Sequence, residues 1–157
     1  IYAAPAAARV VRKDYDYAFE EEKYRGAPDI RLHEIDVARP LEIAGERIVP
    51  VSGHHSERFE VTGYRIGRMA YLTDFKTIAD AEVGKLIGVE LLVVNALRFR
   101  PHPSHFNVEE ALALIARVAP RRALITHVSH EIGQHAATTA LLPRGVELAY
   151  DGLEIII

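Results

Sequence analysis

The chain has 157 residues, of which 49% are hydrophobic and 26% are charged, and its formal net charge is −3. This composition is typical of one globular domain, and neither a run of like charges nor an apolar stretch of about 18 to 20 residues points to nucleic acid or a membrane. Because cysteine is absent, disulfides and thiolate metal sites are excluded, and any metal must be bound by histidines and carboxylates. Without a signal peptide, cytoplasm is the expected location.

The first third of the chain predicts irregular structure followed by strands. Residues 1–28 show no clean hydrophobic period, so we expect a short helix or coil with an aromatic cluster. Residues 30–36 alternate apolar and polar positions as a half-buried strand does, and residues 41–53 predict a hairpin about a glycine-containing turn. The second arm of this hairpin leads into His54 and His55, whose side chains are expected to diverge.

A second hairpin is predicted by the stretch that ends at Asp74. Residues 61–66 and 69–73 are apolar and are separated by Gly67 and Arg68, a spacing typical of a tight turn with glycine at positive φ. Asp74 follows the second strand directly. It is either an aspartate that forms a turn by bonding its own backbone, or a ligand or catalytic group presented at a strand end.

After Asp74 the pattern changes to alternating helices and strands. The helix at 108–118 is the best signalled, because Asn107 is a good N-cap and Glu110 stands where a capping box requires it. We therefore predict one domain with a mixed sheet, antiparallel hairpins first and strand–helix units after. The other expected elements are helices at 78–86 and 133–141, strands at 89–97 and 123–128, and two closing strands about Asp151-Gly152.

Polar groups follow several of the predicted strands. His55, Asp74, the loop 98–106 and His127 each lie at a strand end, where α/β sheets commonly place their sites. Two imidazoles and a carboxylate suit a divalent cation such as zinc or manganese. Two alternatives remain: each histidine can be a hydrogen-bonded structural residue, or His127 can form a separate site with the histidines at positions 130 and 135.

Several segments together resemble the metallo-β-lactamase superfamily, and more narrowly the subgroup that contains phosphoribosyl cyclic phosphodiesterase. The resemblance implies an α/β fold that is the C-terminal portion of an αββα sandwich, with two divalent metal ions, zinc or manganese, at one edge of its sheets. The segments that carry it are GYRIGRMAYLTD, LLVVNALR, HPSHFNVEEALALI, ALITHVSH and VELAYDGLEI.

The resemblance also implies roles for individual residues. Asp74 looks like the aspartate that bridges both metals and takes part in catalysis, His127 looks like the last metal histidine, and His55 is preferred over His54 as the middle one because a small residue follows it. His105 looks like the histidine that binds the phosphate or protonates the leaving group without being a primary ligand. His102, three residues earlier, need not face the same way.

One motif of the family is missing from these 157 residues. The run H-x-H-x-D-H supplies about half of the ligands in the family, and in the family it lies N-terminal to the segment that corresponds to this chain. We therefore expect residues 1–157 to be a single domain that is incomplete at its N-terminus, or else a truncated, non-catalytic remnant. In the first case a sheet face or edge is left uncovered, and a homodimer is a possible result.

These observations favour a metal-dependent hydrolase, with phosphodiesterase activity on a small phosphate ester, cyclic or otherwise, as the leading hypothesis. Metal-activated water would attack the phosphorus in the complete site. Arg98, Arg100 and the helix N-terminus at Asn107 can hold the phosphate, although both arginines can equally be solvated loop residues. The alternatives are a nuclease, a lactone or thioester hydrolase, or a remnant that only binds a partner. No nucleic acid or membrane partner is expected.

Overall fold

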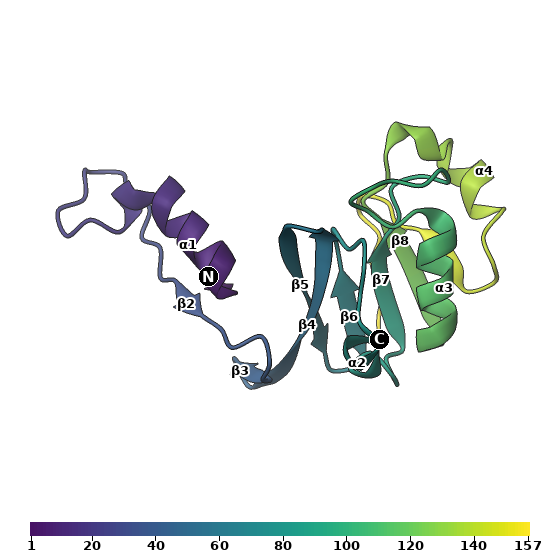
Figure 1. Ribbon diagram of the computed structural model, residues 1–157, viewed down its shortest axis with the longest axis horizontal. Helices are drawn as coiled ribbons and strands as arrows, with labels where there is room; N and C mark the ends of the chain where they lie inside the picture. The colour runs from purple at the N-terminus through teal and green to yellow at the C-terminus, as the bar shows by residue number, and fades with distance from the viewer.

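A seven-stranded mixed sheet is the centre of the computed structural model, which describes residues 1–157 (Figure 1). Strands β3 to β6 pair antiparallel, and β6 to β9 pair parallel, so the predicted α/β class with a mixed sheet is confirmed. In spatial order, which is also chain order, the strands are β3 Leu41–Ile43, β4 Glu46–Ser56, β5 Phe59–Ile66, β6 Met69–Leu72, β7 Leu91–Asn95, β8 Arg122–Thr126 and β9 Val146–Leu148.

Both predicted hairpins are present, and their turns show why. Ala44 and Gly45, which join β3 to β4, have φ of 53° and 85°, as a two-residue turn that matches strand twist requires. Gly67 between β5 and β6 has φ of 55°. Glycine adopts this conformation without steric cost, so the local sequence specifies the register of each hairpin.

Helices cover one face of the sheet. Figure 1 shows α3, Val108–Val118, lying beside β7 and β8, and α2, Asp80–Gly84, at the lower end of the sheet. The predicted capping box is confirmed, because the Asn107 side chain accepts from the Glu110 N–H and the Glu110 side chain accepts from the Asn107 N–H. The apolar side of α3 joins a core of 21 buried residues that includes all the inward residues of β7. The longest helix has 11 residues, and none of the helices can cross a bilayer.

The C-terminal segment packs on the opposite face of the sheet. Leu91, Val93 and Leu124 form a small cluster against which Leu153 and Ile155 pack. The prediction of a second closing strand after Asp151-Gly152 is therefore wrong, because residues 153–157 form no strand. Packing on the sheet face stabilises this segment in place of pairing with β9.

Two further predicted elements, a helix and a strand, are shorter in the structure than the sequence indicated. The helix expected at 133–141 is a 3₁₀ turn, η2 His130–Ile132, followed by α4, His135–Thr139. The strand expected at 30–36 is only β2, His33–Glu34, which pairs parallel with β1, Tyr2–Ala3. These two strands belong to an N-terminal unit with α1, Pro5–Asp14, and η1, Asp16–Ala18.

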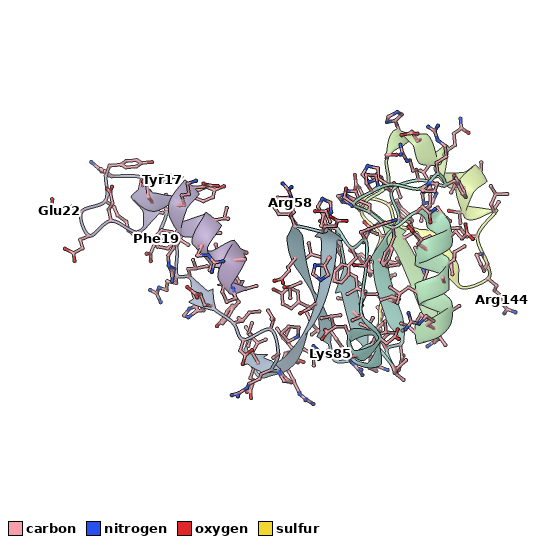
Figure 2. All side chains as sticks on the ribbon, viewed as in Figure 1. Tyr17, Phe19, Glu22, Arg58, Lys85 and Arg144 are labelled. Carbon is pink, nitrogen blue, oxygen red and sulfur yellow. The ribbon has the colours of Figure 1, made fainter.

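The N-terminal unit stands apart from the helical face. It lies beyond β4 and β5 in Figure 1, and Figure 2 shows Tyr17, Phe19 and Glu22 at its end far from the sheet. An open hollow of about 760 Å³ separates the unit from β4 and β5, and it is lined from both sides, by Ala7 of α1 and by His54, Tyr64 and Asp74 among others. The hollow therefore reaches one of the predicted metal ligands.

Candidate metal centre

Asp74 presents its carboxylate from a tight, left-handed turn after β6. Its φ is 64°, a conformation that costs non-glycine residues roughly 1–3 kcal/mol and persists only where neighbours impose it. The next residue, Phe75, is fully buried, and both of its backbone polar groups bond the side chain of Asn95. The Phe75 N–H donates to Asn95 Oδ1 at 2.8 Å, and Asn95 Nδ2 donates to the Phe75 carbonyl at 2.9 Å. Asn95, at the end of β7, thus holds Asp74 in place.

His55 reaches Asp74 because β4 is irregular at this point. The register with β5 shifts between His54 and Ser56, and the His54 backbone pairs with Thr77. The His55 Nδ1 lies 3.2 Å from the Asp74 carbonyl oxygen. Since that oxygen can only accept, the ring proton is on Nδ1, which leaves the Nε2 lone pair free for an ion. His54 is instead exposed and lines the hollow beside the N-terminal unit, so the preference for His55 agrees with this geometry.

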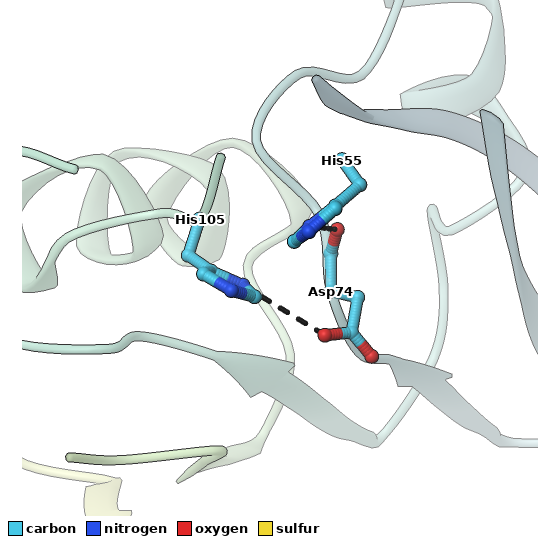
Figure 3. A group of neighbouring side chains, drawn as sticks. All are labelled: His55, Asp74 and His105. Carbon is cyan, nitrogen blue, oxygen red and sulfur yellow. Dashed lines mark hydrogen bonds and ion pairs between the residues drawn. The ribbon is translucent and has the colours of Figure 1, made fainter. Parts of the chain in front are cut away.

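His105 comes from the loop between β7 and α3. Its Nδ1 is 3.8 Å from Asp74 Oδ1, is buried and has no hydrogen-bond partner (Figure 3). The ring centroid lies 4.4 Å from that of His55 and 4.7 Å from that of His127. The loop is anchored next to His105, where the Phe106 N–H donates to the Phe75 carbonyl at 2.8 Å. His105 and Asp74 are therefore fixed to the same short stretch of backbone.

His127 follows β8 in a second left-handed turn, with φ of 56°. Its Nε2 lies 3.3 Å from Asp74 Oδ1, and both side chains are 39% exposed. Two strained, non-glycine residues facing one another at the end of parallel strands are typical of a functional site.

Burial and the neighbouring imidazoles lower the proton affinity of His105. Burial is the largest cause that lowers the pKa of His105 to about 4, followed by the neighbouring His55 and His127, while Asp74 partly offsets them. Without a bound ion or substrate, His105 is therefore neutral near pH 7, and its buried Nδ1 has no partner in the chain.

The donor set fits a divalent cation with nitrogen and oxygen ligands. His55, Asp74 and His105 each offer a ligand atom, and these atoms lie within 4.8 Å of one another. His127 adds a further imidazole against the same carboxylate oxygen. The structure thus brings His55 and His127 to Asp74, but the group whose ligand atoms all lie within 4.8 Å of one another contains His105 and not His127. The alternative site with His130 and His135 is not formed, since His135 bonds the Leu148 carbonyl instead.

An ion-pair cluster joins the two loops that carry His105 and His127. Glu131 accepts from Arg98 Nη1 at 2.6 Å and from Arg100 Nη2 at 2.5 Å, and these two arginines lower the pKa of its carboxyl group. Arg98 also donates to the Pro101 carbonyl at 3.1 Å, and its Nε is buried without a partner. The predicted substrate ligand Arg98 is therefore engaged by Glu131 in this structure.

Three residues near the centre were not assigned a site role from the sequence. Glu131 bonds arginines that lie 31 and 33 residues away in the chain, and Asn95 bonds Phe75, which is 20 residues away. The sequence signal for Asn95 is its place as the one polar residue at the end of the apolar run LLVVN. The third is His102, whose ring lies 5.1 Å from that of His105, so it belongs to the same cluster of imidazoles. Burial and the Arg98 charge are the main causes that lower its pKa.

Comparison with known proteins identifies relatives of the whole chain. Residues 1–128 match the family described as the beta-lactamase superfamily domain. An octanoyltransferase of Porphyromonas gingivalis is 35% identical over 158 residues, which is all of this chain and 32% of that protein. The chain thus spans about a third of this curated relative.

Solved structures agree with the architecture. The crystal structure of a diphosphatase from the PhnP family matches with a TM-score of 0.88 and 33% identity, over 99% of this chain and 57% of that one. The metallo-beta-lactamase fold protein YhfI from Bacillus subtilis matches with a TM-score of 0.69 and 17% identity, over 98% of this chain and 63% of that one. The second likeness concerns the fold alone.

Proposed function

The chain belongs to the beta-lactamase superfamily, and on that basis we propose that the complete protein is a metal-dependent phosphodiesterase acting on a small phosphate ester, cyclic or otherwise. The observation that carries the proposal is the convergence of His55, His105 and His127 on the Asp74 carboxylate at the end of the parallel strands. The likeness to a diphosphatase at 33% identity supports phosphate chemistry over the other reactions that this fold serves.

We propose that divalent ions, zinc or manganese, are held by His55, Asp74 and His127. The complete site would hold two such ions. Bound ions supply Lewis acidity, which lowers the pKa of a water and polarises the phosphoryl oxygen. Asp74 is suited to this place because its turn leaves the carboxylate 39% exposed while Asn95 holds the backbone beneath it. The His55 Nδ1–H bond to the Asp74 carbonyl leaves Nε2 unprotonated and available as a ligand.

His105 is proposed to act on the substrate. With a pKa of about 4 the ring of His105 is neutral at pH 7, and a phosphate anion bound beside it would raise that pKa toward neutrality. Substrate binding itself would thus prepare His105 to protonate the leaving oxygen. In the free protein the same low pKa keeps the ring uncharged between two other imidazoles.

The remaining ligands are proposed to come from polypeptide N-terminal to Ile1. The chain spans 57% of the diphosphatase that it matches, and its own residues offer one carboxylate and three imidazoles to the site. The hollow beside the N-terminal unit reaches Asp74 and leaves room for such a segment. Residues 1–157 would then be one incomplete domain. The coding sequence upstream of Ile1 tests this directly, since it should encode H-x-H-x-D-H.

The activity is tested with the complete, metal-loaded protein on a cyclic phosphodiester and on bis(p-nitrophenyl) phosphate. Asp74→Asn should remove bound metal and hydrolysis together, because a neutral amide is a poor ligand for the ion. His33→Ala is the control, since this exposed imidazole lies on β2, outside the metal cluster and the hollow, and its loss should leave both unchanged. Full activity in Asp74→Asn would contradict the proposal.

A second candidate is an acyl hydrolase, such as a thioester hydrolase. The 35% identity to an octanoyltransferase favours it, although this chain spans only 32% of that protein. The same preparation should therefore be tested on an octanoyl thioester. Faster turnover of the thioester than of either phosphodiester would establish this candidate in place of the first.

A further inference from the structure

His102 offers a donor group that the site described above does not use. Its ring is packed against that of His105, with centroids 5.1 Å apart and planes inclined by 32°. It is not part of the group of side chains that can share an ion. We propose, on the basis of the proposed function, that His102 is a substrate-binding residue. Its neutral imidazole carries a proton on Nε2 and donates a hydrogen bond from that N–H to a phosphoryl oxygen of the substrate, beside His105.

The position of the ring proton follows from the contacts of the other nitrogen. The backbone N–H of Ser104 donates to His102 Nδ1 at 3.3 Å. A backbone N–H cannot accept, so Nδ1 must be unprotonated and the proton of the neutral ring is on Nε2. The Ser104 hydroxyl, also 3.3 Å from Nδ1, can add a second donor to the same atom.

The backbone around His102 is unusually constrained. Proline precedes and follows it, at positions 101 and 103, and each proline ring restricts φ and removes an N–H. The Pro101 carbonyl accepts from Arg98, and Arg98 is held by Glu131. These contacts restrict the backbone, and the Ser104 N–H bond to Nδ1 orients the imidazole before substrate binds, which lowers the entropic cost of using it as a donor.

The donor itself is free. Nε2 of His102 has no hydrogen-bond partner in the chain and is not among the fully buried atoms that lack one. A phosphodiester presents two non-bridging oxygens that need donors, and His105 can serve one of them or the leaving oxygen. A fixed, uncharged donor next to His105 adds directional recognition of phosphate without a further positive charge on the histidine cluster.

The tautomer is measured first, independently of catalysis, in the complete protein with ¹⁵N-labelled histidine. Two-bond ¹H–¹⁵N correlations at pH 8 should show the Nε2–H form for His102, with the resonance assigned by its loss in His102→Gln. Ser104→Ala keeps the backbone donor and should leave the tautomer unchanged, whereas Ser104→Pro removes the donor and should give a mixture. A predominant Nδ1–H form in the unmodified chain would overturn the inference.

The role is measured in the complete, metal-loaded protein. His102→Leu should lower kcat/KM on bis(p-nitrophenyl) phosphate by about 10- to 100-fold, the loss expected for one hydrogen bond to a charged group, with bound metal unchanged. His102→Gln places an amide N–H near the position of Nε2 and should recover most of the loss. Equal activity of His102→Leu and the unmodified protein would overturn the inference.

Failure of the proposed function has a different signature. In that case the unmodified protein would hydrolyse neither phosphodiester, and binding of inorganic phosphate then decides the role of His102. Weaker phosphate binding in His102→Leu than in His102→Gln supports the donor, and equal binding refutes it.

Discussion

Replacing Asn95 by alanine should destabilise the chain more than any other single loss of a polar side chain near the site. Asn95 is fully buried and makes two hydrogen bonds to the backbone of Phe75, at 2.8 and 2.9 Å. Alanine would leave the buried Phe75 N–H without a partner, which costs about 1–3 kcal/mol. The Phe75 carbonyl would lose the bond from Asn95 but keep the one from the Phe106 N–H. Losing that one hydrogen bond should cost about 0.5–1.5 kcal/mol of stability.

The expected decrease in the free energy of unfolding is therefore about 1.5–4.5 kcal/mol, a large part of the 5–15 kcal/mol typical of a domain. Urea unfolding of the metal-free chain, followed by circular dichroism, measures it, and the slope against urea should not change. Asn107→Ala is the control, because it removes a helix cap and should cost only about 1 kcal/mol. A decrease for Asn95→Ala that is below about 1 kcal/mol, or no larger than the control, would refute the reasoning.

The remaining predictions concern the metal, assembly, catalysis and pH. After dialysis the 157-residue chain should retain well under two equivalents of metal, held weakly by Asp74, His127 and His55, and two tightly held ions would contradict this. Because Leu153 and Ile155 pack on the second sheet face mainly against β7 and β8, sedimentation should show association through the rest of that face, and a stable monodisperse monomer would contradict the expectation. In the complete protein, His105→Ala should keep bound metal but lower turnover of a phosphodiester with a poor leaving group by about 10²–10⁴-fold, and much less with an activated aryl leaving group. Equal losses, or lost metal, would show that His105 is a ligand. In the metal-free chain, the pKa of His105 is about 4 in the folded state and 6.5 in the unfolded state, so between these values the unfolded state binds more protons. The contribution of His105 to the free energy of unfolding is therefore complete above pH 6.5 and should decrease as the pH falls toward 4. His105→Gln should flatten this dependence in urea titrations, and increasing stability on acidification would be inconsistent with it.

Local signals account for the parts of the fold that the sequence predicted well. The hairpin between β5 and β6 depends on Gly67, and α3 begins at Asn107 and Glu110 as the capping box predicts. In each case the interacting groups lie within a few residues of one another. The closing strand after Asp151-Gly152 was predicted from the same kind of signal and is wrong, because the competing partner is a sheet face made of β7 and β8.

Some residues of the candidate site can likewise be predicted from local sequence, and others cannot. Asp74 and His127 could be singled out because polar residues directly after apolar strands stand out in the sequence, and the family resemblance supported the selection. The contacts of Glu131 with Arg98 and Arg100 could not be predicted, since the loops that carry them meet only when β7 pairs with β8. The same holds for Asn95, whose partner is 20 residues away in the chain.

The sequence by itself determined the residue types available to the site, the absence of thiolate ligands, and the positions of the turns and the helix cap, because each depends on composition or on neighbours along the chain. Only the tertiary structure decided which of two adjacent histidines faces Asp74 and that His102 joins His105. Side-chain direction at the end of β4 depends on its register shift against β5, and the direction of His102 depends on a loop held by Glu131. Both are set by pairing between segments that are distant in the chain, which local sequence does not specify.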